Sequence, residues 1–363
     1  MYHLLVLTSL AFCTRASISC YGESGQPVDW FIVYKLPKLK NFPLSDGMRY
    51  MYQDAMTCGW ESGKALMNST EGAVGRTLQQ LYRARGNQTG DFAYVLYNDQ
   101  PPNGFNPSNG GHTKGVVLLD KAQGFWLVHS TPHFPPTTKE EYSWPESGLH
   151  NGQSFLCITY GFDQFKEIGQ QLRYNDIFSY DFSITGSFAQ DFPDLLSAAK
   201  RMHLKTAPWN RQVTLTSLGG KKFISFSKYK LFDDDLYSGW VSQALKVDLL
   251  VQFWLNSRGT LQSNCSLSYH VYNVEQIFFS QELSFSSHID HSKWGVSNSS
   301  RPWTCIGDMN RNKEEEKRGG GTVCTSDSQV WKSFHTLVSQ CCDCSQRGHT
   351  MEHKVLTSHH KYK

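Results

Sequence analysis

The feature that most constrains this chain is a histidine placed two residues before a lysine, found once in each half. The two segments are Gly111-His112-Thr113-Lys114-Gly115 and Asp290-His291-Ser292-Lys293-Trp294. In an extended segment, residues i and i+2 face the same side, so each segment presents a proton-transfer group beside a fixed cation. A two-fold arrangement of the halves would therefore bring two histidines and two lysines to a single phosphodiester.

This pattern is weakly specific by itself, because the chain contains four H-x-K sequences. The other two begin at His203 and His359, and we interpret them as solvated surface segments. The residues around each H-x-K sequence are therefore needed to identify which of the four are catalytic.

The composition predicts a folded protein of the secretory pathway. Hydrophobic residues make up 39% and charged residues 18%, which is typical of globular domains. Residues 4–13 form a short apolar run before Ala16 and Ser17, so residues 1–17 are interpreted as a cleaved signal peptide. No later apolar run is long enough to span a bilayer. The net charge of +3 predicts little attraction to polyanions at neutral pH, whereas protonation of the 14 histidines in an acidic lumen would add positive charge.

Cysteines and glycosylation sequences support the same compartment. Nine cysteines follow the signal, which predicts three or four disulfides and at least one unpaired thiol. Four N-x-S/T sequences are candidate glycosylation sites, at Asn68, Asn87, Asn264 and Asn298.

Strands and helices alternate in both halves, which predicts an α/β or α+β fold. The apolar pattern predicts strands over 30–35, 92–98, 116–119, 125–129, 155–160, 213–217, 223–227 and 247–255. It predicts helices over 75–85, 164–173, 236–245 and 330–340. Residues 312–321 are interpreted as a glycine-rich loop, and residues 345–363 as a disordered tail.

Hairpin geometry adds polar groups to both motifs. A turn centred near residue 122 pairs positions whose numbers sum to about 243, so Lys114 is expected opposite His129. Chain reversal near 298–301 would return 303–307 alongside Trp294 and place Asp308 or Asn310 near His291. Each half would then supply a histidine, a lysine and a further polar group.

These residue types suit cleavage of a phosphodiester. One histidine can attack phosphorus while another protonates the leaving oxygen, and lysine can stabilise the charge on the phosphoryl oxygens. The pairs His288/His291 and His129/His133 have spacings compatible with a metal, but no matching carboxylates stand out. We expect neither a metal nor another cofactor.

The chain resembles the deoxyribonuclease II family from about Cys20 to Cys344. The resemblance rests on the two H-x-K segments and on the segments 20–31, 75–82, 124–130, 234–240 and 303–311. It implies a phospholipase D-like pseudodimer with two mixed β-sheet halves flanked by helices, at 18–200 and 201–344. It also implies a lysosomal, or additionally secreted, endonuclease that cuts double-stranded DNA at acidic pH without metal, leaving 3′-phosphate and 5′-hydroxyl ends.

The resemblance also assigns residues. His291 is the expected key catalytic histidine, together with His112, Lys114, Lys293 and His129; His129 and Asp308 hold the places where the wider superfamily has asparagine, with Asn310 nearby. The implied disulfides are Cys20–Cys157, Cys305–Cys324 and Cys265 with a tail cysteine, most simply Cys344. Cys58, Cys341 and Cys342 are left without assigned partners.

Several alternatives stay open at this level. The sequence does not decide which histidine attacks, which subtype of the family the chain resembles, or its oligomeric state, although a monomer with an internal two-fold is expected. A phosphodiesterase acting on lipid head groups and a non-catalytic glycoprotein that binds nucleic acid are the competing functions.

Overall fold

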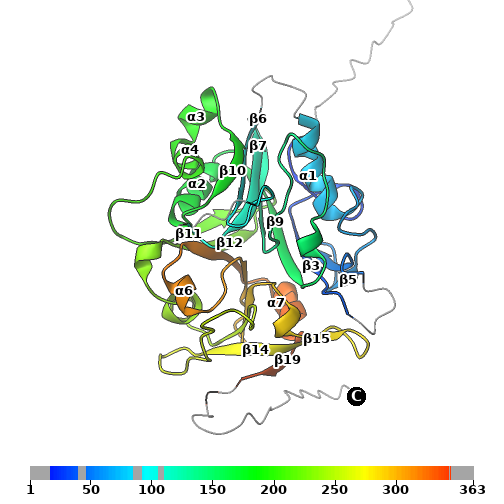
Figure 1. Cartoon of the computed structure of the whole chain (residues 1–363), viewed down its shortest axis with the longest axis vertical. Helices are drawn as coiled ribbons and strands as arrows, with labels where there is room; N and C mark the ends of the chain where they lie inside the picture. Colours follow the sequence, from blue (N-terminus) through cyan, green and yellow to red (C-terminus); the bar gives the residue numbers. More distant parts are fainter. Residues whose placement is uncertain (1–16, 40–45, 85–91, 105–109, 343, 345–363) are drawn as a thin grey trace, which may run out of the picture.

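Two large β-sheets, each drawn from one half of the chain, form the centre of this computed structural model (Figure 1). The structure describes residues 17–39, 46–84, 92–104, 110–342 and 344. Mixed strands and helices, with helices flanking large sheets, confirm the predicted fold class. Nearly all of the predicted signal peptide lies outside the described residues, as do the predicted tail and Asn87.

The first sheet has eight strands, and all of its described pairs are antiparallel. Its order is β10 (Ser179–Ser183), β6 (Phe92–Asn98), β7 (Lys114–Asp120), β8 (Gln123–His129), β9 (Gln153–Gly161), β3 (Trp30–Lys35), β4 (Tyr50–Asp54) and β5 (Glu61–Ser62). A separate short hairpin joins β1 (Cys20–Tyr21) to β2 (Pro27–Val28). The predicted register of the β7–β8 hairpin is confirmed, because Val116 pairs with Leu127 and Gly115 with Val128.

The second sheet has nine strands, among which β13 and β14 form a parallel pair. Its order is β11 (Asn210–Thr216), β12 (Lys222–Lys228), β18 (Gly320–Thr325), β17 (Thr304–Gly307), β16 (Trp294–Ser297), β13 (Leu249–Gln252), β14 (Val271–Phe278) and β15 (Ser284–Ser286), with β19 (Val338–Cys341) also paired to β14. The series β6-β7-β8-β9-β3 in the first sheet matches β13-β16-β17-β18-β12 in the second. One H-x-K ends at the first residue of β7 and the other directly before β16, so the motifs hold equivalent places.

Three apolar clusters hold these layers together. The largest lies between the sheets, where Trp126 and Val117 of the first sheet join Trp294 and Val296 of the second. Alternate residues of β7, such as Val116, point to the other face and pack beneath helix α1 (Ala73–Ala84). Because both faces are covered, the central strands are apolar throughout rather than alternating with polar residues.

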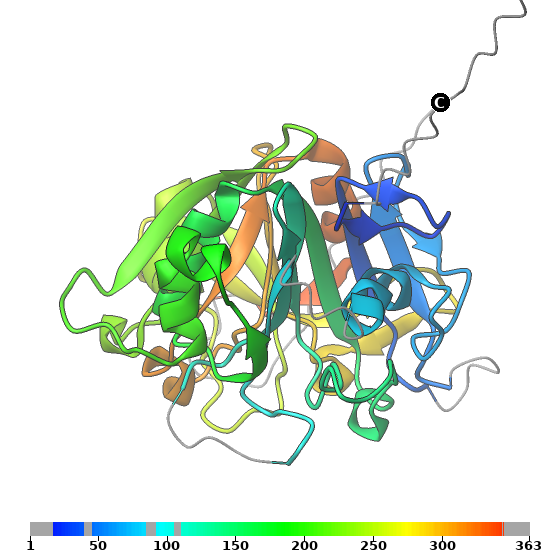
Figure 2. The ribbon, with the colours of Figure 1, turned by 90° about the horizontal axis from the view of Figure 1, so that it is seen from above.

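Helices cover the two sides of the molecule (Figure 2). Helix α1 lies against the outer face of the first sheet, and α2 (Gln164–Tyr174), α3 (Ser187–Asp191) and α4 (Pro193–Ala199) lie on the other side. The outer face of the second sheet packs against the π-helical turn η3 (Tyr237–Val241) and α5 (Ser242–Leu245). The elements η1 (Glu146–Gly148), η2 (Lys230–Phe232) and η4 (Ser287–Ile289) are short 3-10 helices.

Two predictions near the C-terminus hold only in part. The helix expected over 330–340 is α7 (Ser328–His335), and β19 follows it, because the edge of β14 offers hydrogen bonds to that segment. The loop expected over 312–321 contains helix α6 (Lys313–Glu316) and the start of β18. Asn312 caps α6, since its side-chain oxygen accepts a hydrogen bond from the Glu315 nitrogen at 3.0 Å.

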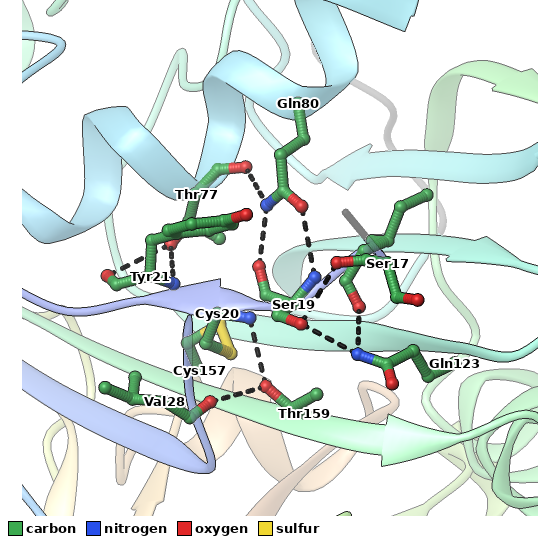
Figure 3. The surroundings of a disulfide bond; sticks show 11 residues. Ser17, Ser19, Cys20, Tyr21, Val28, Thr77, Gln80, Gln123, Cys157 and Thr159 are labelled. Carbon is green, nitrogen blue, oxygen red and sulfur yellow. Dashed lines mark hydrogen bonds between the residues drawn. A yellow bond between two sulfur atoms is a disulfide. The ribbon is translucent and has the colours of Figure 1, made fainter. Parts of the chain in front are cut away.

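The described residues form three disulfides, and they are the pairs that the resemblance implies: Cys20–Cys157, Cys265–Cys344 and Cys305–Cys324. The first ties the N-terminal strand β1 to β9, where the Thr159 hydroxyl also accepts a hydrogen bond from the Cys20 nitrogen (Figure 3). Cys58, Cys341 and Cys342 are not disulfide-bonded.

None of the helices within the described ranges combines the length and apolar character needed to cross a membrane. Among the candidate glycosylation residues, Asn68 and Asn298 are exposed and Asn264 is half-buried. Their modification stays a prediction.

Candidate active site

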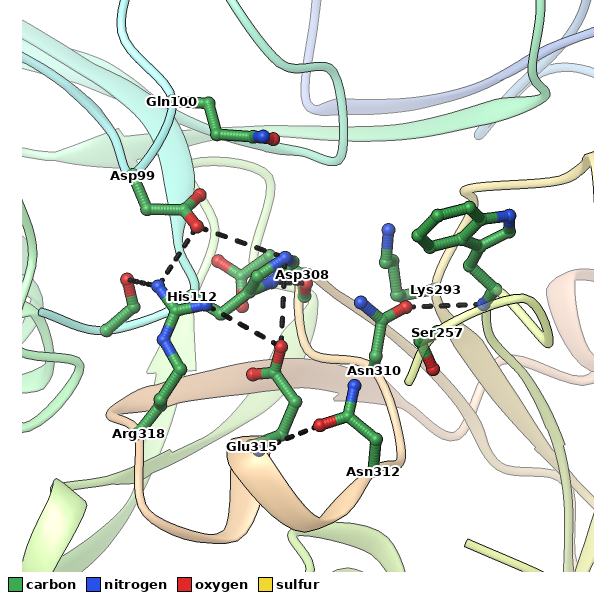
Figure 4. A network of polar contacts seen from close by, with 12 residues as sticks. Asp99, Gln100, His112, Ser257, Lys293, Asp308, Asn310, Asn312, Glu315 and Arg318 are labelled. Atoms are coloured by element: carbon green, nitrogen blue, oxygen red, sulfur yellow. Dashed lines mark hydrogen bonds and ion pairs between the residues drawn. The ribbon is translucent and has the colours of Figure 1, made fainter. Parts of the chain in front are cut away.

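The first motif is held by residues of the second half. The His112 nitrogen donates to the Gly319 carbonyl at 2.9 Å, and its ring Nδ1 lies 2.5 Å from the Asp308 carbonyl. Its Nε2 lies 4.0 Å from a carboxylate oxygen of Asp99 and 3.9 Å from one of Glu315 (Figure 4). Of these partners of His112, Asp99 belongs to the first half and the others belong to the second half.

Lys114 is buried at the start of β7, where its ammonium group donates to Asp99 at 2.5 Å. Asp99 also accepts from Arg318 at 3.0 Å, and Arg318 donates to the carbonyls of Gly110 and Gly111. Burial alone would raise the pKa of Asp99, but Lys114, His112 and Arg318 hold it well below its ordinary value. Asp99 is therefore an anion that fixes the position of the first motif.

The second motif is held by the first half in the same manner. The His291 nitrogen donates to the Gly152 carbonyl at 2.8 Å, and the Lys293 nitrogen donates to the Ser154 hydroxyl at 3.1 Å. The Lys293 ammonium group turns back to the His291 carbonyl at 2.6 Å. Both supporting residues lie at or directly before the start of β9.

A buried polar cluster fixes the residues on both sides of His291. The Tyr34 hydroxyl donates to the Asp290 carboxylate, and the Ser292 hydroxyl contacts both of them, at 2.9 and 2.8 Å. The Ser292 nitrogen donates to the other Asp290 oxygen at 3.0 Å. Tyr34 belongs to β3, so this cluster again crosses between the halves.

The two supports correspond across the halves. Gly152 directly precedes β9, and Gly319 directly precedes β18. These two strands hold the same place in the matching strand series of the two sheets. Behind Gly152, the buried Lys35 of β3 donates to the carbonyls of Leu149 and Asn151. Behind Gly319, the buried Lys228 of β12 donates to three carbonyls, those of Glu315, Glu316 and Arg318. Each histidine is thus placed by a glycine carbonyl in a loop that a buried lysine secures.

The two motifs lie close enough for each lysine to act on the histidine of the other motif. Burial and then Lys114 lower the pKa of His112 well below its ordinary value, and Lys293 lowers it further. Burial, Lys293 and then Lys114 lower the pKa of His291 to about 2. Figure 4 shows Lys293 and Asn310 in the same site as His112 and Asp308. The structure therefore brings the two H-x-K motifs into one centre.

Three ionisable groups of this centre titrate near neutrality. Burial and then Lys114 lower the pKa of Lys293 to about 7. Burial raises the pKa of Asp308 to about 7, against the lowering effect of Lys114, and raises that of Glu315 to about 7, against that of Arg318. Below pH 7 the lysine is charged and the carboxyl groups are neutral, so acidification makes the site more positive.

Of the two supporting groups expected near His291, Asp308 lies at the other motif and Asn310 lies on the His291 side. Asp308 does not serve the motif of its own half: its carboxylate accepts from the Lys114 nitrogen at 3.3 Å and its carbonyl contacts the His112 ring. Asn310 accepts from the Trp254 nitrogen at 3.2 Å, and the Trp254 ring contacts His291. Strand pairing within the second half could not predict that Asp308 contacts the first motif, because Lys114 belongs to the other sheet.

His129 lies fully buried at the end of β8, on the apolar face opposite the shared core. Its ring stacks on Phe155 and meets Phe134 edge-on, while its Nδ1 accepts from the Thr131 nitrogen at 3.2 Å. Burial and then Lys114 lower its pKa well below the ordinary value. This neutral ring is enclosed by aromatic side chains, and its Nε2 has no hydrogen-bond partner.

Sequence reasoning missed Asp99, Glu315, Arg318, Tyr34 and Trp254. One local signal was present for Glu315, since asparagine followed three residues later by glutamate is a helix-start pattern. His203, from an unused H-x-K, pairs with Asp176 at the surface, at 2.9 Å. Within the part of the chain that the structure describes, no three histidine, cysteine or acidic side chains are grouped to bind a metal ion.

Comparison with known proteins points to one family. A family model described as Deoxyribonuclease II matches residues 19–344. The chain is 49% identical to deoxyribonuclease-2-alpha of Mus musculus, over 94% of this chain and 97% of the relative. It is 42% identical to deoxyribonuclease-2-beta of Homo sapiens, over 93% and 94%, and 38% identical to plancitoxin-1 of Acanthaster planci, over 94% and 97%.

Proposed function

This chain belongs to the deoxyribonuclease II family and is a nuclease, and we propose that it is an acid endonuclease that cleaves double-stranded DNA without a metal ion. The single observation that carries the mechanism is the meeting of two histidine–lysine pairs, with buried lysines and half-buried histidines, each held by the opposite half. The matching strand order supports an internal two-fold in one chain, of the phospholipase D-like kind, with halves at 18–200 and 201–344.

The surroundings of the two histidines differ, which supports different roles. His112 lies within 4.0 Å of two carboxyl groups, and one of them, the Asp99 anion, favours its protonated form. Among the described residues, no carboxyl group lies within ion-pair distance of His291, and its buried Nε2 has no hydrogen-bond partner. We therefore assign His291 as the nucleophile and His112 as the general acid.

In the first step a ring nitrogen of His291 attacks phosphorus, and the bond from phosphorus to the 5′-oxygen breaks. His112 gives its proton to that oxygen, which leaves as a 5′-hydroxyl group. Water then attacks the phosphohistidine and gives a proton to His112, and the phosphorus–nitrogen bond breaks. The phosphate stays on the 3′-oxygen. Lys114 and Lys293 stabilise the phosphoryl oxygens throughout.

An acidic optimum follows from the charges of the site. In the free protein, burial and the two lysines disfavour the proton that His112 needs. A bound phosphodiester brings a negative charge that offsets the lysines, and low pH supplies the proton. Acid also keeps Lys293 charged and Asp308 and Glu315 neutral. Delivery to lysosomes through the secretory pathway, with glycosylation and some secretion, fits such an enzyme and its disulfides.

Nicking of supercoiled plasmid tests this proposal, measured from pH 4 to pH 8 with and without EDTA. His291→Ala is expected to abolish cleavage at pH about 5, and EDTA is expected to leave wild-type cleavage unchanged. His203→Ala is the matched control, because His203 belongs to an H-x-K at the surface. Strong inhibition by EDTA, or cleavage by His291→Ala, would overturn the mechanism.

The assignment of roles has its own experiment. Phosphate-labelled DNA is mixed with His112→Ala and with His291→Ala at acidic pH, and the denatured protein is examined for label. We expect label on His291 in the first variant and none in the second. The reverse pattern would exchange the two roles.

A further inference from the structure

The ring of His291 is held differently from that of His112. The His112 ring contacts the Asp308 carbonyl and two carboxyl groups. The His291 ring instead lies against Trp254, with ring centroids 4.4 Å apart and planes tilted by 51°. Its Nε2 is buried and unbonded. An imidazole without a polar anchor is free to rotate unless packing restrains it.

Trp254 is itself fixed at two points. Its indole nitrogen donates to the His288 carbonyl at 3.1 Å, and its main-chain nitrogen donates to Asn310 at 3.2 Å. Asn256 donates to the same His288 carbonyl at 2.9 Å. His288 lies three residues before His291, so the indole is joined to the segment that carries the histidine.

We propose that Trp254 is the positioning residue for the His291 ring, and that Asn310 acts on His291 through Trp254. This inference rests on the proposed function, in which His291 attacks phosphorus. A nucleophile must keep its nitrogen in line with the bond that breaks, and an error of about 1 Å can cost about 10²-fold in rate. An aromatic contact supplies that restraint without bonding either ring nitrogen.

The indole also shields the imidazole from water. Burial is the largest cause of the lowered pKa of His291, followed by the charges of Lys293, Lys114 and Lys35. Removing the indole admits water and leaves these three lysines in place. The pKa of His291 should therefore rise, and less of the neutral nucleophile should be present at acidic pH.

The experiment compares Trp254→Ala, Trp254→Phe and Asn310→Ala in the full chain, measuring kcat and KM on plasmid DNA from pH 4 to pH 7. For Trp254→Ala we expect kcat to fall about 10- to 100-fold with KM changed less than about 3-fold. The acidic side of its kcat profile should move to higher pH. Trp254→Phe should recover most of the loss, and Asn310→Ala should fall between the two.

Trp331→Ala is the matched control. Trp331 also lies against a histidine, His335, at 4.9 Å, and its indole nitrogen donates to the Ser297 carbonyl at 2.9 Å. The hydrogen bond of Trp331 goes to the far end of β16, three residues beyond Trp294, and its ring partner is His335 rather than a histidine of either motif. We expect its kcat and its pH profile to stay unchanged, with thermal melting recorded for every variant to show that each one is folded.

The outcomes separate this inference from the proposed function. A folded Trp254→Ala protein with normal kcat and pH profile, or with a raised KM alone, would overturn the positioning role, and the second result would make Trp254 a surface that stacks on DNA. Equal losses in Trp254→Ala and Trp331→Ala would also overturn it. Activity in His291→Ala would instead overturn the proposed function, whatever Trp254 does.

Discussion

Gly152 lies so close to Asp290 that a Cβ atom on the glycine would overlap the Asp290 carboxylate. The Gly152 carbonyl accepts the main-chain hydrogen bond of His291 at 2.8 Å, and its nitrogen donates to Ile289 at 3.0 Å. The absence of a side chain at this position is therefore what allows β9 to approach the second motif.

Gly152→Ala should move His291 away from its place and lower the nicking rate at acidic pH by about 10²-fold. Gly161→Ala is the control at the other end of β9, where an added Cβ meets nothing within 4 Å. Rates would be measured on supercoiled plasmid. Equal activity of the two variants would show that the close approach to Asp290 does not matter for catalysis.

Lys293→Met should weaken DNA binding more at low pH than at high pH. The pKa of Lys293 lies at about 7, so its charge is present below that pH and is lost as the pH rises through it. The ratio of Kd values with and without the substitution, measured in the inactive His291→Ala background from pH 5 to pH 8.5, should shrink on going alkaline. The exposed Lys205 provides the control, as Lys205→Met. A ratio that stays constant would contradict the prediction.

Lys228→Met should lower both stability and activity. Three carbonyl groups lose their common donor, at a cost of about 1–3 kcal/mol for each group left unpaired when buried. Residues 315–319, which include Glu315 and the Gly319 carbonyl that accepts from the His112 nitrogen, then lose this restraint. Urea denaturation and plasmid nicking measure the two effects. Lys222→Met, at the exposed start of the same strand, should change neither.

Replacing both Cys20 and Cys157 with alanine should lower the free energy of unfolding by about 2–4 kcal/mol, because the bond closes a long loop. Cys58→Ala, which removes an exposed thiol outside the disulfides, should have little effect. Denaturant titration measures both. A double variant as stable as wild type would show that the hydrogen bonds around β1 suffice.

Local sequence predicted the parts of the fold that depend on neighbours. The spacing of the β7–β8 hairpin gave its register, since strand direction and turn position fix which residues face each other. The helix predicted over 164–173 is present as α2, at nearly the same bounds. In contrast, the apolar residues around Val338 predicted a helix. The segment is a strand because it pairs with the edge of β14.

The surroundings of the histidines could not be predicted in this way. Glu315, Arg318 and Tyr34 are far in sequence from the motif that each one supports, and periodicity says nothing about contacts between sheets. The family resemblance identified the reacting groups but left their roles equivalent. The difference appears only when the carboxyl groups beside His112 are compared with the indole beside His291.

The crossed supports of the two motifs have a consequence during synthesis. A growing chain that has left the ribosome as far as residue 200 carries His112 and Lys114 but lacks the Gly319 carbonyl, Glu315 and Arg318. Such a fragment has no assembled centre, and the same is true of the later half alone. The surroundings of His112 can form only after residues 308–319 have been made and have folded onto the first half.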